Sequence, residues 1–198
     1  LSLDAEAELR CRAAGCDAAA IGCGMGRGDE TDALTRRLLT LELPLVLDAD
    51  GINALSGHID ELSCRRSLVT VLTPHDGELA RIGGDMAAPR ESAASDLAVR
   101  HGVYLVRKGR RTVVAAPDGR LAVNTTGNDG MAKGGSGDVL TGLLASLLAQ
   151  GTEPFAACCA AVWLHGRAGD LAAADKGRRG MTPVDMIEKL PYALKEVE

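Results

Sequence analysis

The glycine-rich segment 124–138 is the stretch of this chain whose residue types could do chemistry. Its glycines surround Ser136, it ends in Asp138, and an apolar helix begins there. Glycines allow backbone N–H groups to turn towards a ligand, and a helix start adds a positive dipole end at the same place. The pattern therefore predicts a phosphate-binding turn with one carboxylate beside it. Because phosphate repels that carboxylate, we expect Asp138 to accept the proton of a hydroxyl that receives a phosphoryl group.

Other polar residues lie where strands are expected to end. Asp48 and Asp50 follow a buried strand. They could face a metal-bound phosphate or cap the next helix, and the sequence favours neither role over the other. His75 lies between a strand and a helix, where a substrate contact is favoured over an ordinary loop histidine. The basic segment Lys108–Thr112 joins two strands, and it fits either a solvated turn or a loop over a nucleotide.

Strands alternating with helices must position these residues. Strands are expected at 18–22, 44–47, 67–72, 103–107, 112–115 and 121–123, and helices at 30–41, 89–100, 139–149 and 153–174, with a last short one after Thr182-Pro183. This alternation predicts an α/β fold with a mostly parallel sheet covered on both faces and a late β-hairpin at Pro117-Asp118-Gly119. Ligands of such sheets bind beyond the carboxyl ends of the strands, so the polar motifs should converge there.

Composition and known motifs exclude several classes of function. The net charge of −5 provides no basic surface for nucleic acid, and 2% aromatic residues leave almost no base-stacking platform. No apolar run is long enough to cross a bilayer. The loop 22–28 lacks the dinucleotide-binding glycine register, and neither a P-loop nor a serine nucleophile elbow is present. The six cysteines show no zinc or redox spacing, which favours a reducing cytoplasm.

Six segments, taken in order, carry a family resemblance. They are Gly22–Gly26, Val46–Asn53, Leu72–Glu78, Lys108–Thr112, Asn124–Leu144 and His165–Asp170. Together they resemble the carboxy-terminal domain of the ADP/ATP-dependent NAD(P)H-hydrate dehydratases, over nearly the whole chain from about residue 18. The chain departs from the family's usual pattern at Cys23 and Asp76, where proline is usual, and at Arg110 and Arg111, where smaller residues are usual.

The resemblance implies a ribokinase-like three-layer α/β/α fold in one domain, residues 1–198. The family's domain begins with further strands and helices, so we expect this chain to lack them and to leave an open sheet edge. The implied reaction phosphorylates the ring hydroxyl of hydrated NADH or NADPH with ADP or ATP and Mg²⁺. Phosphate then leaves, and the dihydronicotinamide is restored.

The resemblance also assigns the site residues. Asp138 is the catalytic base and contacts substrate, together with Gly24, Gly26 and His75. The nucleotide-binding residues are Lys108, Gly109, Arg110, Arg111, Thr112, Asn128, Gly134, Gly135, Ser136 and Gly137. No protein ligand is assigned to the metal. The implied partners are the hydrated dinucleotide and the nucleotide, with no nucleic acid and no membrane, and with a homo-oligomer, since resembling proteins are tetramers.

Two other functions stay open at this point. A small-molecule hydroxyl kinase, such as a vitamin-precursor kinase, would use the same Asp138 and stop at the phosphorylated product. A non-catalytic fragment would bind nucleotide without turnover, because the missing front segments carried substrate contacts.

Overall fold

A six-stranded sheet forms the centre of the molecule, whose computed structural model describes all residues, 1–198. The strands follow chain order across the sheet: β1 (Ala19–Ile21), β2 (Leu45–Leu47), β3 (Thr70–Leu72), β4 (Tyr104–Arg107), β5 (Val113–Ala115) and β6 (Leu121–Val123). Strands β1 to β4 pair in parallel, whereas β4, β5 and β6 pair antiparallel. The predicted mostly parallel sheet with a late hairpin is therefore confirmed.

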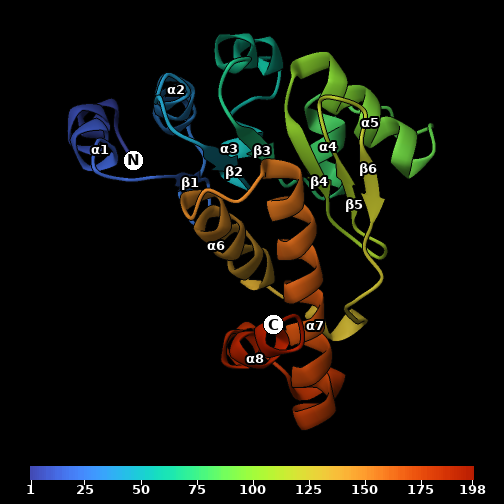
Figure 1. The fold of residues 1–198 in the computed structure, drawn as a ribbon. Coiled ribbons are helices and arrows are strands. Elements are labelled where there is room, and N and C mark those ends of the chain that lie inside the picture. Colours follow the sequence, from blue (N-terminus) through green and yellow to red (C-terminus); the bar gives the residue numbers. More distant parts are fainter.

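Helices cover both faces of this sheet. They are α1 (Glu6–Ala13), α2 (Asp29–Leu38), α3 (Asp50–Asn53), α4 (Asp76–Arg81), α5 (Arg90–His101), α6 (Ser136–Ala149), α7 (Pro154–Gly180) and α8 (Pro183–Lys195). Three 3₁₀ turns complete the chain, at Leu3–Ala5, Ile59–Arg65 and Asp129–Met131. Helices α2 to α5 pack on one face, and α6 and α7 pack on the other, which gives three layers (Figure 1).

The alternation of side chains along each strand divides the apolar interior into two cores. In β2, Leu45 and Leu47 join the core under α2 to α5, while Val46 between them joins the core under α6 and α7. The same division separates Leu105 from Val106 in β4. Successive strand residues point to opposite faces, so continuous apolar runs are what a sheet buried on both sides requires.

Two glycines let the ends of β1 and β2 approach each other closely. A Cβ on Gly22, which has a φ of +128°, would lie 1.8 Å from the carbonyl oxygen of Asp48, and one on Gly51 would lie 2.4 Å from that of Ile21. No side chain fits at either position. The loop after β1 is therefore held against the start of α3, beside the carboxyl end of β2.

The helices differ from the predicted ones mainly at their ends. Helix α6 begins at Ser136, two residues before Asp138, so this carboxylate lies within the first turn rather than ahead of it. Helix α7 continues to Gly180, with a break at Gly177, where φ is +72°. Helix α8 has 13 residues and is not short; Thr182 caps it by accepting a hydrogen bond from the amide of Asp185.

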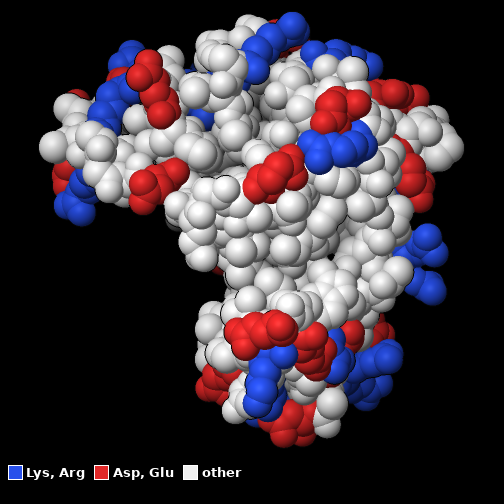
Figure 2. All heavy atoms as spheres, in the orientation of Figure 1, with Lys and Arg blue, Asp and Glu red and all other residues white.

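Helix α8 and the C-terminal end of α7 extend beyond the sheet (Figure 1). Figure 2 shows that charged side chains gather over these two segments, while the surface across α6 and the first half of α7 carries few charges. None of the helices combines the length and the apolar character needed to cross a membrane.

Candidate functional site

A large cavity of about 1260 Å³ opens at the carboxyl ends of the central strands. The loop between β4 and β5, the loop after β6 and the first turn of α6 surround it, and Val162, His165 and Gly166 of α7 form its rear wall. His75 and Arg178 complete its rim. Only 4 of its 23 lining residues are hydrophobic, so the cavity suits a polar ligand of nucleotide size.

The first turn of α6 presents free backbone amides to this region. Gly135 precedes the helix with a φ of +91°, and no side chain caps the helix. The amides of Gly137 and Asp138 have no hydrogen-bond partner within the protein. Unpaired N–H groups at a helix start bind anionic oxygens, which is what the glycine-rich sequence predicts for this turn.

His165 supports this turn from behind. Its Nε2 lies 2.9 Å from the carbonyl oxygen of Ser136 and 3.3 Å from the Ser136 hydroxyl. Burial lowers the pKa of His165 to about 4, against a smaller opposing effect of the hydrogen bond to the Ser136 backbone. The imidazole is therefore neutral at physiological pH, and its Nε2–H donates to the Ser136 carbonyl, which fixes the start of α6.

The next turn of α7 holds the loop after β6. The carboxylate of Asp170 accepts hydrogen bonds of 2.9 Å from the amide of Gly127 and from the side-chain amide of Asn128. A Cβ on Gly166 would lie 2.2 Å from the hydroxyl of Thr126, so only glycine allows this close contact. Segment 165–170 thus positions both the loop and the first turn of α6.

Lys108 connects the cavity to the end of β2. Its ammonium donates to the Asp48 carboxylate at 2.5 Å and lies 3.9 Å from Glu78. Asp48 is 1% exposed, and its carboxylate also accepts a hydrogen bond of 2.8 Å from the hydroxyl of Thr141. Burial alone would raise the pKa of Asp48, but the charge and hydrogen bond of Lys108, with those of the threonines, outweigh burial and lower it. Asp48 is therefore ionised and paired, and it caps no helix.

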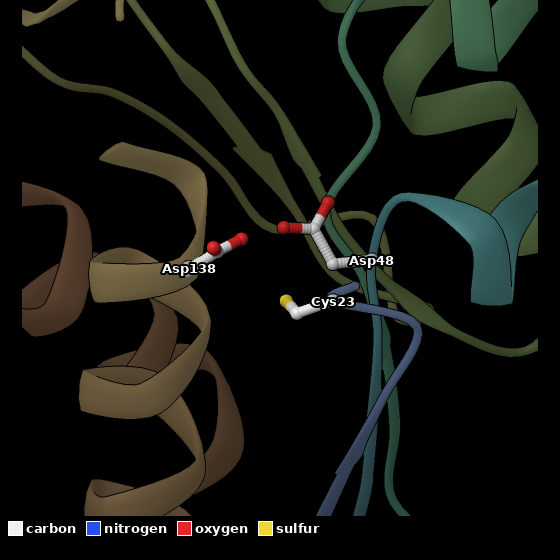
Figure 3. Close-up of side chains that lie close together, drawn as sticks. All are labelled: Cys23, Asp48 and Asp138. Atoms are coloured by element: carbon white, nitrogen blue, oxygen red, sulfur yellow. The ribbon is translucent and has the colours of Figure 1, made fainter. Parts of the chain in front are cut away.

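Asp138 belongs to the first turn of α6, but its side chain is on the side away from the cavity and does not line it. Its carboxylate, the carboxylate of Asp48 and the thiol of Cys23 lie with their ligand atoms within 4.8 Å of one another. Figure 3 shows these side chains meeting from α6, from the end of β2 and from the loop after β1. Burial, with the neighbouring carboxylates, raises the pKa of Cys23 to about 11, so the thiol is protonated at neutral pH.

The structure therefore divides the predicted site residues between two sides of the first turn of α6. The cavity contains His75, Lys108, Gly109, Arg110, Arg111, Thr112, Asn128, Gly134, Ser136 and Gly137. Gly24 and Gly26 lie with Cys23 in the loop on the Asp138 side, where Asp50 accepts a hydrogen bond of 3.0 Å from the amide of Gly26. Gly135 does not line the cavity; it packs towards Pro183 of α8.

Three residues in this site have roles that were not identified from the sequence. They are Asp48 as the partner of Lys108, His165 behind Ser136, and Asp170 under Asn128. Two glycines three residues apart, Gly166 and Gly169, were a usable signal, because that spacing puts both on one helix face that another segment can approach.

Comparisons with known proteins decide the family. The model of a family described as NAD(P)H-hydrate dehydratase matches residues 3–192. The chain belongs to this family. It is 43% identical over 203 residues to a bifunctional NAD(P)H-hydrate repair enzyme of Moorella thermoacetica, an alignment that covers 100% of this chain and 38% of that protein.

Solved structures of relatives agree with the fold. The Bacillus subtilis ADP/ATP-dependent NAD(P)H-hydrate dehydratase, crystallised with ATP and Mg²⁺, is 31% identical and has a TM-score of 0.80, with 94% of this chain and 71% of that chain covered. A ribokinase-like superfamily protein of Enterococcus faecalis has a TM-score of 0.82 at 25% identity, with 99% and 69% covered. The predicted ribokinase-like fold is confirmed for this family member, which spans 38% of the Moorella protein's length.

Proposed function

We propose that this chain dehydrates hydrated NADH or NADPH in a reaction that consumes ADP or ATP. One observation carries the proposal: the first turn of α6 has a nucleotide-sized polar cavity on one side and the Asp138 carboxylate on the other. A phosphoryl group at the free amides of Gly137 and Asp138 would lie between a donor in the cavity and a hydroxyl beside Asp138. The names of the Moorella and Bacillus relatives support this substrate and co-substrate.

The chemistry then follows from the positions of these groups. The ring hydroxyl oxygen attacks the terminal phosphorus of the nucleotide, and the bond from that phosphorus to the bridging oxygen breaks with its electron pair on the departing nucleotide. Asp138 accepts the hydroxyl proton, while the two amides stabilise charge on the transferring group. Inorganic phosphate then leaves with the electron pair of the carbon–oxygen bond, driven by the lone pair of the ring nitrogen. Water accepts the proton lost from the neighbouring ring carbon, which completes the dehydration.

Magnesium fits this site as an ion carried by the nucleotide. Magnesium commonly binds through substrate phosphates and keeps several waters. Asp48 is occupied by Lys108 and Thr141, and a protonated thiol is a poor ligand for a hard cation, so these side chains do not form a separate cage for it. When bound, the ion would neutralise charge on the phosphates.

A product assay tests the proposal. Purified chain is incubated with NADH hydrate, ADP or ATP, and Mg²⁺, and both inorganic phosphate and the near-ultraviolet absorbance of the dihydronicotinamide are followed. Equal release of phosphate and recovery of absorbance is expected. A phosphorylated product that accumulates would instead identify a hydroxyl kinase, and nucleotide binding without turnover would identify a non-catalytic fragment. A single-domain organisation, a homo-oligomeric state and a cytoplasmic location stay predictions.

A further inference from the structure

The carboxylates of Asp48 and Asp138 lie close enough to influence each other's ionisation. An oxygen of each lies within 4.8 Å of the other, and one comes from the end of β2 and the other from the first turn of α6 (Figure 3). Two ionised carboxylates this close repel each other, which favours a proton on one of them. A proton held there would remove the base that the proposed reaction needs.

Lys108 supplies the charge that prevents this. Its ammonium lies 2.5 Å from Asp48, and it would be 3.6 Å from a Cβ on Gly137, so it is beside the residue that precedes Asp138. It has little room to move away, because its side chain is only 19% exposed and Glu78 lies 3.9 Å from it. The ammonium is thus held between the Asp48 carboxylate and the start of α6.

The charged and titratable groups that contact or face this cluster come from four segments. They are Cys23 of the loop after β1, Lys108 of the loop after β4, Glu78 of α4 and His165 of α7. Cys23 and His165 are neutral at physiological pH, as described above, and the Glu78 carboxylate lies 3.9 Å from the Lys108 ammonium. Lys108 is therefore the one cation in this group.

We propose that Lys108 and Asp48 form a positioning pair for the general base: the ammonium cancels the charge of Asp48, so Asp138 stays ionised beside it and can accept the hydroxyl proton. The proposal rests on the proposed function for the use of that proton. It assigns Asp48 a role outside both metal binding and helix capping, and it gives Lys108 a second role besides lining the nucleotide cavity.

Two opposite substitutions test the pair by the pH dependence of kcat at saturating nucleotide. Lys108→Met leaves two uncompensated carboxylates, so the acidic limb of the profile should move to higher pH by about one unit or more. Asp48→Asn removes the like charge and frees the ammonium to approach Asp138, so the limb should move to lower pH. The double variant Asp48→Asn/Lys108→Met should return towards the wild type. A merely structural role would not give shifts of opposite sign.

Controls keep the test decisive. Arg111→Met removes another cation of the same cavity that has no acidic partner, and it should weaken nucleotide binding while the acidic limb stays in place. If Lys108→Met fails to fold with an unpaired buried carboxylate, the double variant contains no buried charge at either position and can be compared with Asp48→Asn alone. When Asp48 is already Asn, the further change Lys108→Met should move the acidic limb of the kcat profile to higher pH.

A measurement without turnover separates this proposal from the proposed function. Carbon-13 NMR of labelled aspartate carboxyls, with Asp138→Asn for assignment and ADP present, follows each carboxylate through a pH titration. In Lys108→Met, the protonation step of Asp138 should move to higher pH. An unmoved Asp138 step, or shifts of both single variants in the same direction, would overturn the proposal. Absence of dehydratase turnover would reject the proposed function and leave this NMR result standing.

Discussion

The hydroxyl of Thr141 donates a 2.8 Å hydrogen bond to the buried carboxylate of Asp48, 93 residues away in the chain. The bond joins the second turn of α6 to the end of β2 and fixes the rotation of the helix about its axis. Asp138 precedes Thr141 by three residues and shares its helix face, so it is turned towards the same strand end. The position of the proposed general base is therefore set by a contact inside the core.

Asp138→Asn should separate catalysis from nucleotide binding. The amide cannot accept the hydroxyl proton, so we expect the dehydration rate to fall at least ~10²-fold. Asp138 does not line the cavity, so ADP affinity by calorimetry should stay close to that of the wild type. Asp96→Asn on the exposed side of α5 is the matched control and should leave both values unchanged. Full turnover in Asp138→Asn would remove the proposed base.

Gly166→Ala should destabilise the protein and weaken nucleotide binding together. The added Cβ would meet both the hydroxyl of Thr126 at 2.2 Å and its backbone carbon at 2.8 Å, so a rotamer change alone cannot relieve the contact. We expect a loss of about 1–3 kcal/mol in the free energy of unfolding, measured by urea denaturation.

The matched control is Gly142→Ala in α6, an exposed position with nothing within 4 Å of the new Cβ. There the methyl group should stabilise the helix by roughly 0.5–1 kcal/mol. A loss of stability at Gly142 equal to that at Gly166 would show that the contact with Thr126 is not the cause.

Arg110 and Arg111 should provide charge for the nucleotide phosphates. Arg178 pairs with Asp129, and Lys133 donates to the carbonyl oxygen of Arg179, but neither Arg110 nor Arg111 has a partner within the protein. Arg110→Ser should therefore weaken binding of ATP more than that of AMP, and added salt should narrow the difference between variant and wild type.

Arg111→Gly should affect stability and affinity in opposite directions. Arg111 has a φ of +57°, a conformation that costs a side chain of this kind about 1 kcal/mol and that glycine adopts freely. Stability should not fall, whereas ATP affinity should fall as in Arg110→Ser. An Arg111→Gly protein that is less stable than Arg110→Ser would contradict the strain at this position.

Stability should fall on acidification because of His165. Its pKa is about 4 in the folded protein and near its ordinary 6.5 in the unfolded chain, so the unfolded state binds the proton first. The contribution is fully present above about pH 6.5 and is lost by about 1.4 kcal/mol per pH unit as the pH falls towards 4. In His165→Gln, the slope of unfolding free energy against pH over this range should decrease.

The sheet and most helices were predictable because their signals are local. Buried runs such as Leu45–Leu47 have few alternatives to a central strand, and Pro117-Asp118-Gly119 is a strong turn signal. The glycine-rich turn at Ser136 was predictable for the same reason, because several consecutive residues there indicate the same phosphate-binding turn.

The partners within the site were not predictable in this way. Lys108 and Asp48 are 60 residues apart, and His165 and Ser136 are 29 apart, so no local pattern joins them. His165 lies in an apolar helical stretch where a structural role is the ordinary interpretation. The position of Asp138 outside the cavity depends on the rotation of α6, which follows from its contact with Asp48 rather than from the order of residues in the turn.

The strict chain order of the strands has a consequence for synthesis. Each strand pairs only with those made immediately before and after it, so the sheet can assemble step by step as the polypeptide leaves the ribosome. His165 and Asp170 hold the first turn of α6 and the loop after β6, and they leave the ribosome some forty residues after the last strand. A nascent chain therefore completes its sheet well before the supports of the cavity are made, and the proposed nucleotide site is among the last parts to form.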